Sequence, residues 1–236
     1  MGDNDVRMKI SKQVLLNQQM SESFLTAALL SFSGGLQDAY TYLARGKVFA
    51  NAQTGNIVLL SKNLFEGRPE AILRYFVPLA FFAMGVAAAE CFRYRFKNAQ
   101  KLHWRQGVLV IEILLLFLVG YFPGSLNLLA NALVSFSCAM QVQAFRKVNS
   151  YQYASTMCIG NLRSGVEAFV HYNNTRKRRL LHRSLHYFGV IFAFAMGAGT
   201  GSILVPHWGM QTLWVSCVLL FIILLLMFIP APEQIK

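Results

Sequence analysis

Long stretches without charge constrain this chain more than any other feature of its sequence. Over residues 107–142, Glu112 is the only charged side chain, and comparable apolar stretches recur along the 236 residues. About 20 mostly apolar residues are enough to span a bilayer as a helix. The sequence therefore predicts an all-α integral membrane protein with six long transmembrane helices, near 24–44, 72–92, 107–122, 125–145, 185–205 and 210–229.

Charged residues are scarce and gather in short clusters between these segments. They make up 14% of the chain, whereas soluble domains carry about a quarter. The net charge of +12 could suggest nucleic acid, but no helix-turn-helix, zinc-finger or RNA-binding pattern accompanies it. Lys and Arg of membrane proteins collect in cytoplasmic loops and face anionic lipid. We therefore predict no nucleic-acid partner, and an anionic-lipid contact at Arg176, Lys177, Arg178 and Arg179.

The sequence lacks the usual catalytic and metal-binding patterns. Its four cysteines stand singly in apolar surroundings, and its five histidines show no metal-ligand spacing. It has no nucleophile elbow, HExxH pair, phosphate-binding loop or dinucleotide fingerprint. We therefore expect no enzyme activity, no metal and no cofactor.

An internal repeat divides the chain into two related halves. Residues 28–33 (ALLSFS) match 132–137 (ALVSFS) at an offset of 104, and Gly55-Asn56 matches Gly160-Asn161 at an offset of 105. Each half would contain a long helix, a short polar segment and two further long helices. The predicted organisation is a cytoplasmic N-terminal tail (1–23), a first membrane repeat (24–123), a second membrane repeat (124–230) and a C-terminal tail (231–236).

The two short segments, 50–65 and 154–170, decide the topology. If they cross the membrane, there are eight crossings and parallel halves; if they are re-entrant, there are six crossings and inverted halves. Six crossings place 17 of the 22 Lys and Arg inside, and leave outside only Arg45, Lys47, Lys62, Arg68 and Arg74. Eight crossings place 13 inside and 9 outside. The positive-inside rule therefore favours six crossings, inverted halves and cytoplasmic termini.

The first long segment contains one acid, Asp38, just after Gly34-Gly35. An Asp in a spanning helix costs about 3 kcal/mol unless it is paired, protonated or hydrated. Asp38 could bind a proton, a cation or a substrate, or it could hold the neighbouring short segment by a hydrogen bond. The glycine pair would permit close helix approach or a break in the helix. Glu112 is a weaker candidate for ion coupling.

Both short segments carry polar residues that could form a solute site. We expect the backbone to unwind at the two Gly-Asn pairs, and half-helices from opposite faces to meet near the midplane. The alternative is that Gly-Asn serves only as a packing turn. The predicted substrate- or ion-binding residues are Gln37, Asp38, Asn51, Thr54, Gly55, Asn56, Gln141, Thr156, Gly160 and Asn161.

The residues around Asp38 and Asn56 resemble the hallmark of the YoaK-like bacterial transmembrane proteins, a family with a domain of unknown function. Residues 35–39 (GLQDA) and 54–56 (TGN) match its Gly-x-x-Asp-Ala and Thr-Gly-Asn patterns. The second half departs from the family's Gln-Asn-Ala and Thr-Thr-x-x-Thr-Gly, with QVQA at 141–144 and STMCIGN at 155–161. The resemblance covers residues 23–229 and implies a multi-pass protein of the bacterial inner membrane, without naming a substrate.

These features together predict a secondary transporter or permease for a small solute, with a path between the two halves and proton coupling through Asp38. The alternative is a non-transporting membrane scaffold or sensor, in which the polar motifs only hold helices together. Either protein could act as a single chain or as a homo-oligomer.

Overall fold

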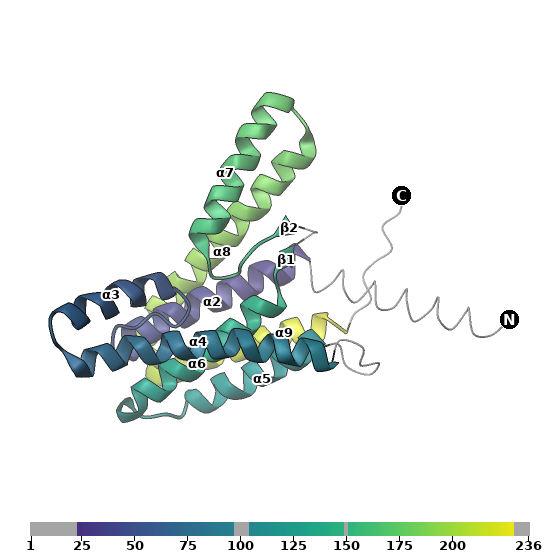
Figure 1. The fold of residues 1–236 in the computed structure, drawn as a ribbon. Helices are drawn as coiled ribbons and strands as arrows, with labels where there is room; N and C mark the ends of the chain where they lie inside the picture. Colours follow the sequence, from purple (N-terminus) through teal and green to yellow (C-terminus); the bar gives the residue numbers. More distant parts are fainter. Residues whose placement is uncertain (1–22, 97–103, 149–150, 229–236) are drawn as a thin grey trace.

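The computed structural model describes residues 23–96, 104–148 and 151–228, and over these residues the chain is almost entirely helical (Figure 1). The predicted C-terminal tail, and the predicted N-terminal tail except Ser23, lie outside the described residues. The helices are α2 (Phe24–Ala44), α3 (Gln53–Phe65), α4 (Pro69–Phe96), α5 (Trp104–Val119), α6 (Asn127–Ala144), α7 (Cys158–Thr175), α8 (Arg178–Trp208) and α9 (Leu213–Leu226).

Each predicted apolar segment overlaps one of these helices. The bounds agree for some segments and differ for others. The segment 24–44 coincides with α2, whose N-cap Ser23 accepts a hydrogen bond from the Thr26 backbone N–H. In contrast, α8 begins at Arg178 rather than near 185, because a helix can continue through basic residues beyond its apolar stretch. Two 3₁₀ turns, η1 (Gly124–Leu126) and η2 (Gly209–Thr212), precede α6 and α9.

A small element that the sequence did not predict joins α6 to α7. Strands β1 (Lys147–Val148) and β2 (Tyr151–Gln152) pair antiparallel. The Tyr153 N–H extends the pairing by donating to the Arg146 carbonyl at 3.0 Å. The fold is therefore all-helical apart from this two-stranded hairpin in the described residues.

Three helical stretches are long and apolar enough to cross a membrane: Pro69–Phe96, Gly124–Ala144 and Arg178–Leu226. The third contains both α8 and α9, separated by η2. Large apolar side chains such as Phe192 and Phe221 lie exposed on these helices. Exposed apolar surface of this kind suits contact with lipid rather than water.

The long helices pack in a reciprocal pattern between the two parts of the chain. Helix α2 packs along α8, and α6 packs along α4. The backbones of α4 and α6 approach each other closely: a Cβ atom added at Gly85 would stand 2.3 Å from the Phe136 carbonyl oxygen. The Gly34-Gly35 pair also serves close approach, since a Cβ atom at Gly35 would stand 2.0 Å from the Phe194 carbonyl oxygen. Helix α2 stays unbroken there, so close approach rather than a break is the outcome.

A buried arginine ties the end of α2 to the end of α5. Arg45 is 1% exposed, and its guanidinium donates to the Tyr40 hydroxyl at 2.7 Å and to the Val119 carbonyl at 2.9 Å. Further bonds reach the carbonyl of Pro123 and the side chain of Asn127. A buried charge needs such partners, and the helix C-terminus supplies carbonyls that lack intrahelical ones.

The ends of the helices are arranged in two groups (Figure 1). Helix α2 begins, α4 ends and α9 ends at the same end of the bundle. Helix α3 lies beside α4 and runs toward the opposite end, whereas α7 and the first part of α8 form a hairpin that projects from the bundle.

Candidate functional site

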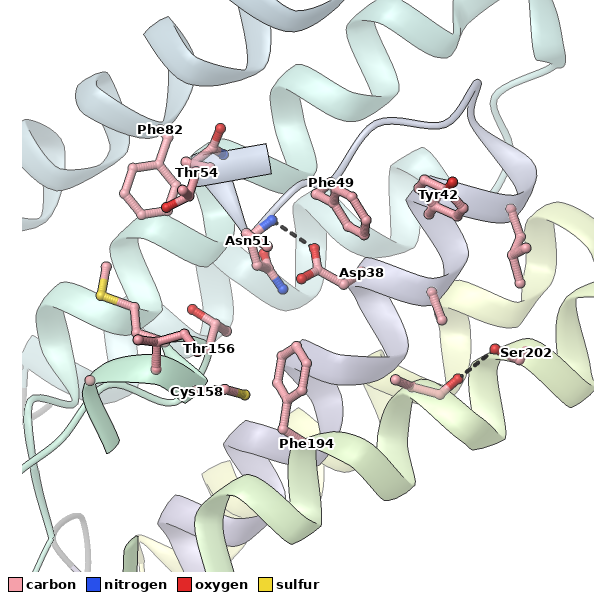
Figure 2. Close-up of a pocket in the computed structure, with 18 residues that line it drawn as sticks. Asp38, Tyr42, Phe49, Asn51, Thr54, Phe82, Thr156, Cys158, Phe194 and Ser202 are labelled. Carbon is pink, nitrogen blue, oxygen red and sulfur yellow. Dashed lines mark hydrogen bonds between the residues drawn. The ribbon is translucent and has the colours of Figure 1, made fainter. Parts of the chain in front are cut away.

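A pocket of about 780 Å³ lies where the two short helices begin. Helices α2, α4 and α8 form its walls, and the N-terminal ends of α3 and α7 border it from different parts of the chain (Figure 2). Five predicted site residues line it: Asp38, Asn51, Thr54, Thr156 and Gly160. The sequence reasoning therefore identified residues that lie far apart in the chain and come together at one cavity.

Asp38 projects from α2 into this region and is 5% exposed. Its Oδ1 atom accepts a hydrogen bond of 2.8 Å from the Asn51 backbone N–H, just before α3 begins (Figure 2). The structure thus contains the hydrogen bond to the short segment that was the structural alternative for Asp38. Because the same carboxyl group also lines the pocket, one residue can both hold the loop and meet a solute.

One polar side chain at the pocket has an unused hydrogen-bonding atom. Asn51 donates from Nδ2 to the Gly34 carbonyl at 2.8 Å, but its buried Oδ1 has no partner among the described residues. The Thr156 hydroxyl, in contrast, has the Cys138 thiol as a hydrogen-bonding neighbour. Buried polar atoms without partners are uncommon in folded proteins, so Asn51 Oδ1 is available to a ligand.

The two predicted asparagines of the Gly-Asn pairs do not line the pocket. The Asn56 side chain donates to the Phe49 carbonyl and accepts from the Phe49 N–H at 3.2 Å. The Asn161 side chain makes the same pair of bonds with Ala154: it donates to the Ala154 carbonyl at 2.7 Å and accepts from the Ala154 N–H at 3.4 Å. Each amide therefore pins the loop seven residues upstream, and so shapes the pocket wall from behind.

The backbone does not unwind at either Gly-Asn pair, so that expectation was wrong. Gly55-Asn56 lies within α3 and Gly160-Asn161 within α7. The asparagine side chains satisfy the preceding loops, which leaves the helical backbone bonds intact. Gly55 instead makes room for an aromatic ring, since a Cβ atom there would stand 3.2 Å from Phe49 Cδ2.

The predicted glutamines meet in the core, behind the pocket. Both contact Glu112 of α5, which is 0% exposed. Gln37 donates to Ser33 at 3.1 Å and approaches Glu112 Oε1 at 3.5 Å. When the Gln141 amide is oriented so that its oxygen accepts from Ser155, its nitrogen donates to Glu112 at 2.9 Å. Glu112 thus lies between Gln37 and Gln141, which are 104 positions apart in the chain. The sequence feature that pointed to Glu112 was its position as the only charge in the apolar stretch 107–142.

Aromatic side chains are the part of the pocket that sequence reasoning missed. Tyr42, Phe49, Phe82 and Phe194 line it, contributed by α2, the loop before α3, α4 and α8. Aromatic residues are frequent throughout this sequence, at 13%, so no single one stood out. Among the described residues, no three His, Cys, Asp or Glu side chains form a group that could hold a metal ion.

The basic run lies at the turn of the projecting hairpin. Arg176 closes α7 in a left-handed conformation (φ 53°), and Lys177 precedes α8. A second cavity of about 450 Å³ beside it is lined by Lys177, Arg179 and Arg183 together with Glu167. The anionic-lipid contact of this run stays a prediction.

Comparison with known proteins places the chain in a family. The model of a protein family of unknown function, DUF1275, matches residues 26–226. The chain belongs to the DUF1275 family. A relative, "UPF0700 transmembrane protein YoaK" of Bacillus subtilis (strain 168), is 26% identical over 207 residues, which cover 82% of this chain and 89% of the relative. No solved structure matches the chain.

The family match confirms the resemblance to the YoaK-like proteins. It also supports the membrane assignment, because the Bacillus relative is named a transmembrane protein and the present DUF1275 chain has helices long and apolar enough to span. The DUF1275 description assigns no activity. The function therefore has to be argued from the pocket.

Proposed function

We propose that this membrane protein is a secondary transporter or permease for a small solute, and that the pocket beside Asp38 is its binding site. One observation carries the proposal: the N-terminal ends of α3 (13 residues) and α7 (18 residues), from different halves of the chain, border one cavity that contains a buried carboxyl group. Helix N-termini present unpaired backbone N–H groups, and paired helix ends of this kind recur at transporter substrate sites.

The proposed architecture is two inverted membrane repeats with six crossings. Reciprocal packing of α2 on α8 and of α6 on α4 supports it, because each half offers its first long helix to the other half. The common end at which α2 begins and α9 ends agrees with an even number of crossings (Figure 1). On the positive-inside rule we assign that end to the cytoplasm, and the chain to the inner membrane of a bacterial cell.

The rival function is a membrane scaffold or sensor that transports nothing. The hydrogen bond between Asp38 and Asn51, and the loop contacts of Asn56 and Asn161, favour it, because they give these polar groups a structural role. The Asn51 Oδ1 atom without a partner and the adjacent cavity of about 780 Å³ favour transport instead, because a packed scaffold needs no such cavity.

Uptake by proteoliposomes distinguishes the two functions. Vesicles with the purified protein would be mixed with a ¹³C-labelled extract of water-soluble metabolites, and retained solutes identified by mass spectrometry. Transport predicts at least one solute enriched over protein-free vesicles, and loss of that uptake in Asp38→Asn. Glu70→Gln, which removes an equivalent charge from an exposed position of α4, is the matched control and should retain uptake.

The scaffold function predicts a different result in the same vesicles. No solute would be enriched, and Asp38→Asn would lower only thermal stability in detergent. Enrichment that is equal in wild type and Asp38→Asn would exclude the proposed site while leaving transport in place.

A further inference from the structure

The pocket beside Asp38 has an acidic side chain and no basic one in its described lining. Among the described residues that line it, Asp38 is the only acid, and no Lys, Arg or His is present. Asn51, Gln53, Thr54, Thr156 and Ser202 contribute neutral polar groups. A carboxylate in an apolar setting gains most from a partner of opposite charge, because the low dielectric strengthens the attraction.

Aromatic side chains lie near this carboxyl group in the pocket lining. Figure 2 shows the Phe194 ring extending from α8 toward Asp38 and Asn51, with Phe49 on the other side of the carboxyl group and Phe82 farther along the cavity. Ring faces carry negative electrostatic potential and attract organic cations, which lose less hydration than small ions. Asp38 and the ring faces therefore attract the same sign of charge. The N-terminal ends of α3 and α7 favour negative charge instead, and at α3 the Asp38 carboxyl group already supplies it by accepting from the Asn51 N–H.

Tyr42 shows that one of these rings already interacts with a cation. The Lys47 Nζ atom lies 4.8 Å from the centroid of the Tyr42 ring, and Phe49 stacks on that ring at 4.7 Å. We therefore assign no ligand contact to Tyr42. Phe49 is engaged in the same stack, so Phe82 and Phe194 remain for a ligand, and Lys47 does not line the cavity.

We propose that the pocket binds a water-soluble organic amine, with the ammonium group at Asp38 and an apolar body against Phe194 and Phe82. The assignment rests on the proposed function, whose substrate class it names. Asn51 Oδ1 supplies a further acceptor for the ammonium protons, and it has no other partner among the described residues. A cavity of about 780 Å³ is of the size that holds a molecule with one or more rings.

Three probes that share one body but differ in charge test the assignment. They are 2-phenylethylamine (cation), 2-phenylethanol (neutral) and phenylacetate (anion), titrated by calorimetry into the protein in phosphatidylglycerol nanodiscs. We expect the amine to bind at least tenfold more tightly than the alcohol, and phenylacetate to give no binding. Equal affinity for amine and alcohol, or preference for the anion, would overturn the proposal without requiring any variant.

Variants then locate the interaction. Asp38→Asn keeps an oxygen that can accept from the Asn51 N–H, and should weaken amine binding at least tenfold while leaving the alcohol unchanged. Phe194→Leu retains the carboxyl group and should weaken the amine more than the alcohol. Glu70→Gln should change neither affinity. Amine binding that survives both pocket variants would place the site elsewhere.

Lipid composition separates a soluble amine from an amine on a lipid. Repeating the titration in nanodiscs that contain phosphatidylethanolamine should leave the affinity unchanged; competition by that lipid would identify a headgroup as the occupant and overturn the assignment to a soluble amine. The vesicle experiment separates this inference from transport itself. Uptake only of anions or neutral solutes, without competition by 2-phenylethylamine, would overturn the amine site alone, whereas amine binding without any uptake would overturn transport alone.

Discussion

Gly197 of α8 lies directly against the backbone of Phe32 in α2: a Cβ atom added at Gly197 would stand 1.9 Å from the Phe32 carbonyl oxygen. The equivalent contact in the other half joins Gly85 to Phe136. Small residues at helix crossings allow backbones to approach closely, which is a main source of helix association in lipid. Each glycine ends an Ala-Met-Gly sequence, 83–85 in one half and 195–197 in the other, and both have a packing role.

Replacing Gly197 by Ala should destabilise the fold strongly. The new methyl group would meet backbone atoms that cannot move independently, so α2 and α8 would have to separate; overpacking of this kind costs about 1–3 kcal/mol or more. Thermal unfolding in detergent would measure the loss. Gly199→Ala is the control in the same helix, because its Cβ position has nothing within 4 Å, and it should be neutral or stabilising. Equal effects of the two substitutions would contradict this packing.

Asn56→Ala and Asn161→Ala should each loosen the loop that precedes a short helix. Each removes two hydrogen bonds to the loop and leaves a backbone N–H and a carbonyl unpaired, at a cost of about 1–3 kcal/mol. Asn56→Ala also removes a third bond, from Nδ2 to Gln53 Oε1. Limited proteolysis should show faster cleavage near Phe49 or Ala154 respectively. Asn63→Ala is the control in α3, because that side chain bonds only the Leu59 carbonyl four residues earlier. Cleavage rates that match the control would refute the loop role.

Glu112→Leu should destabilise the protein more than Glu112→Gln. Leucine leaves the amides of Gln37 and Gln141 without their shared acceptor in a buried core, whereas the glutamine oxygen can still accept from one of them. The expected difference is about 1–3 kcal/mol, measured as unfolding midpoints in the same detergent. A leucine variant as stable as wild type would show that the two glutamines do not depend on this carboxyl group.

Phe65 and Tyr94 should lie on opposite sides of the membrane. They are 92% and 78% exposed, at the end of α3 and near the end of α4, and α4 has 28 residues, enough for a length of about 42 Å. Single cysteines at these positions, in a chain whose native cysteines are replaced, would be labelled with an impermeant maleimide in intact cells. We expect labelling at 65 and none at 94 until the cells are opened. The reverse pattern, or labelling of both, would overturn the six-crossing arrangement.

Local periodicity and composition predicted the helices well, but not how the short segments behave. Apolar stretches marked the positions of α2, α4, α5, α6, α8 and α9, although α5 has only 16 residues and α9 only 14, and three helical stretches are long and apolar enough to span a membrane. Polar content marked α3 and α7 as different. The unwinding expected at Gly-Asn failed because the decisive interaction is a side-chain bond to a loop seven residues away. The hairpin of β1 and β2 was missed for a similar reason, since four paired residues leave no periodic pattern.

The sequence by itself determined that this chain is an all-helical membrane protein, because the absence of charge over helix-length stretches leaves few other environments for it. It also singled out Asp38, Asn51 and Thr156 as polar groups in unusual places. Only the tertiary structure decided that these three meet at one cavity with Phe49, Phe82 and Phe194, while Gln37 and Gln141 turn to Glu112 instead. Which polar groups face a cavity depends on the packing of α2 against α8 and of α6 against α4, and such packing joins residues more than 100 positions apart.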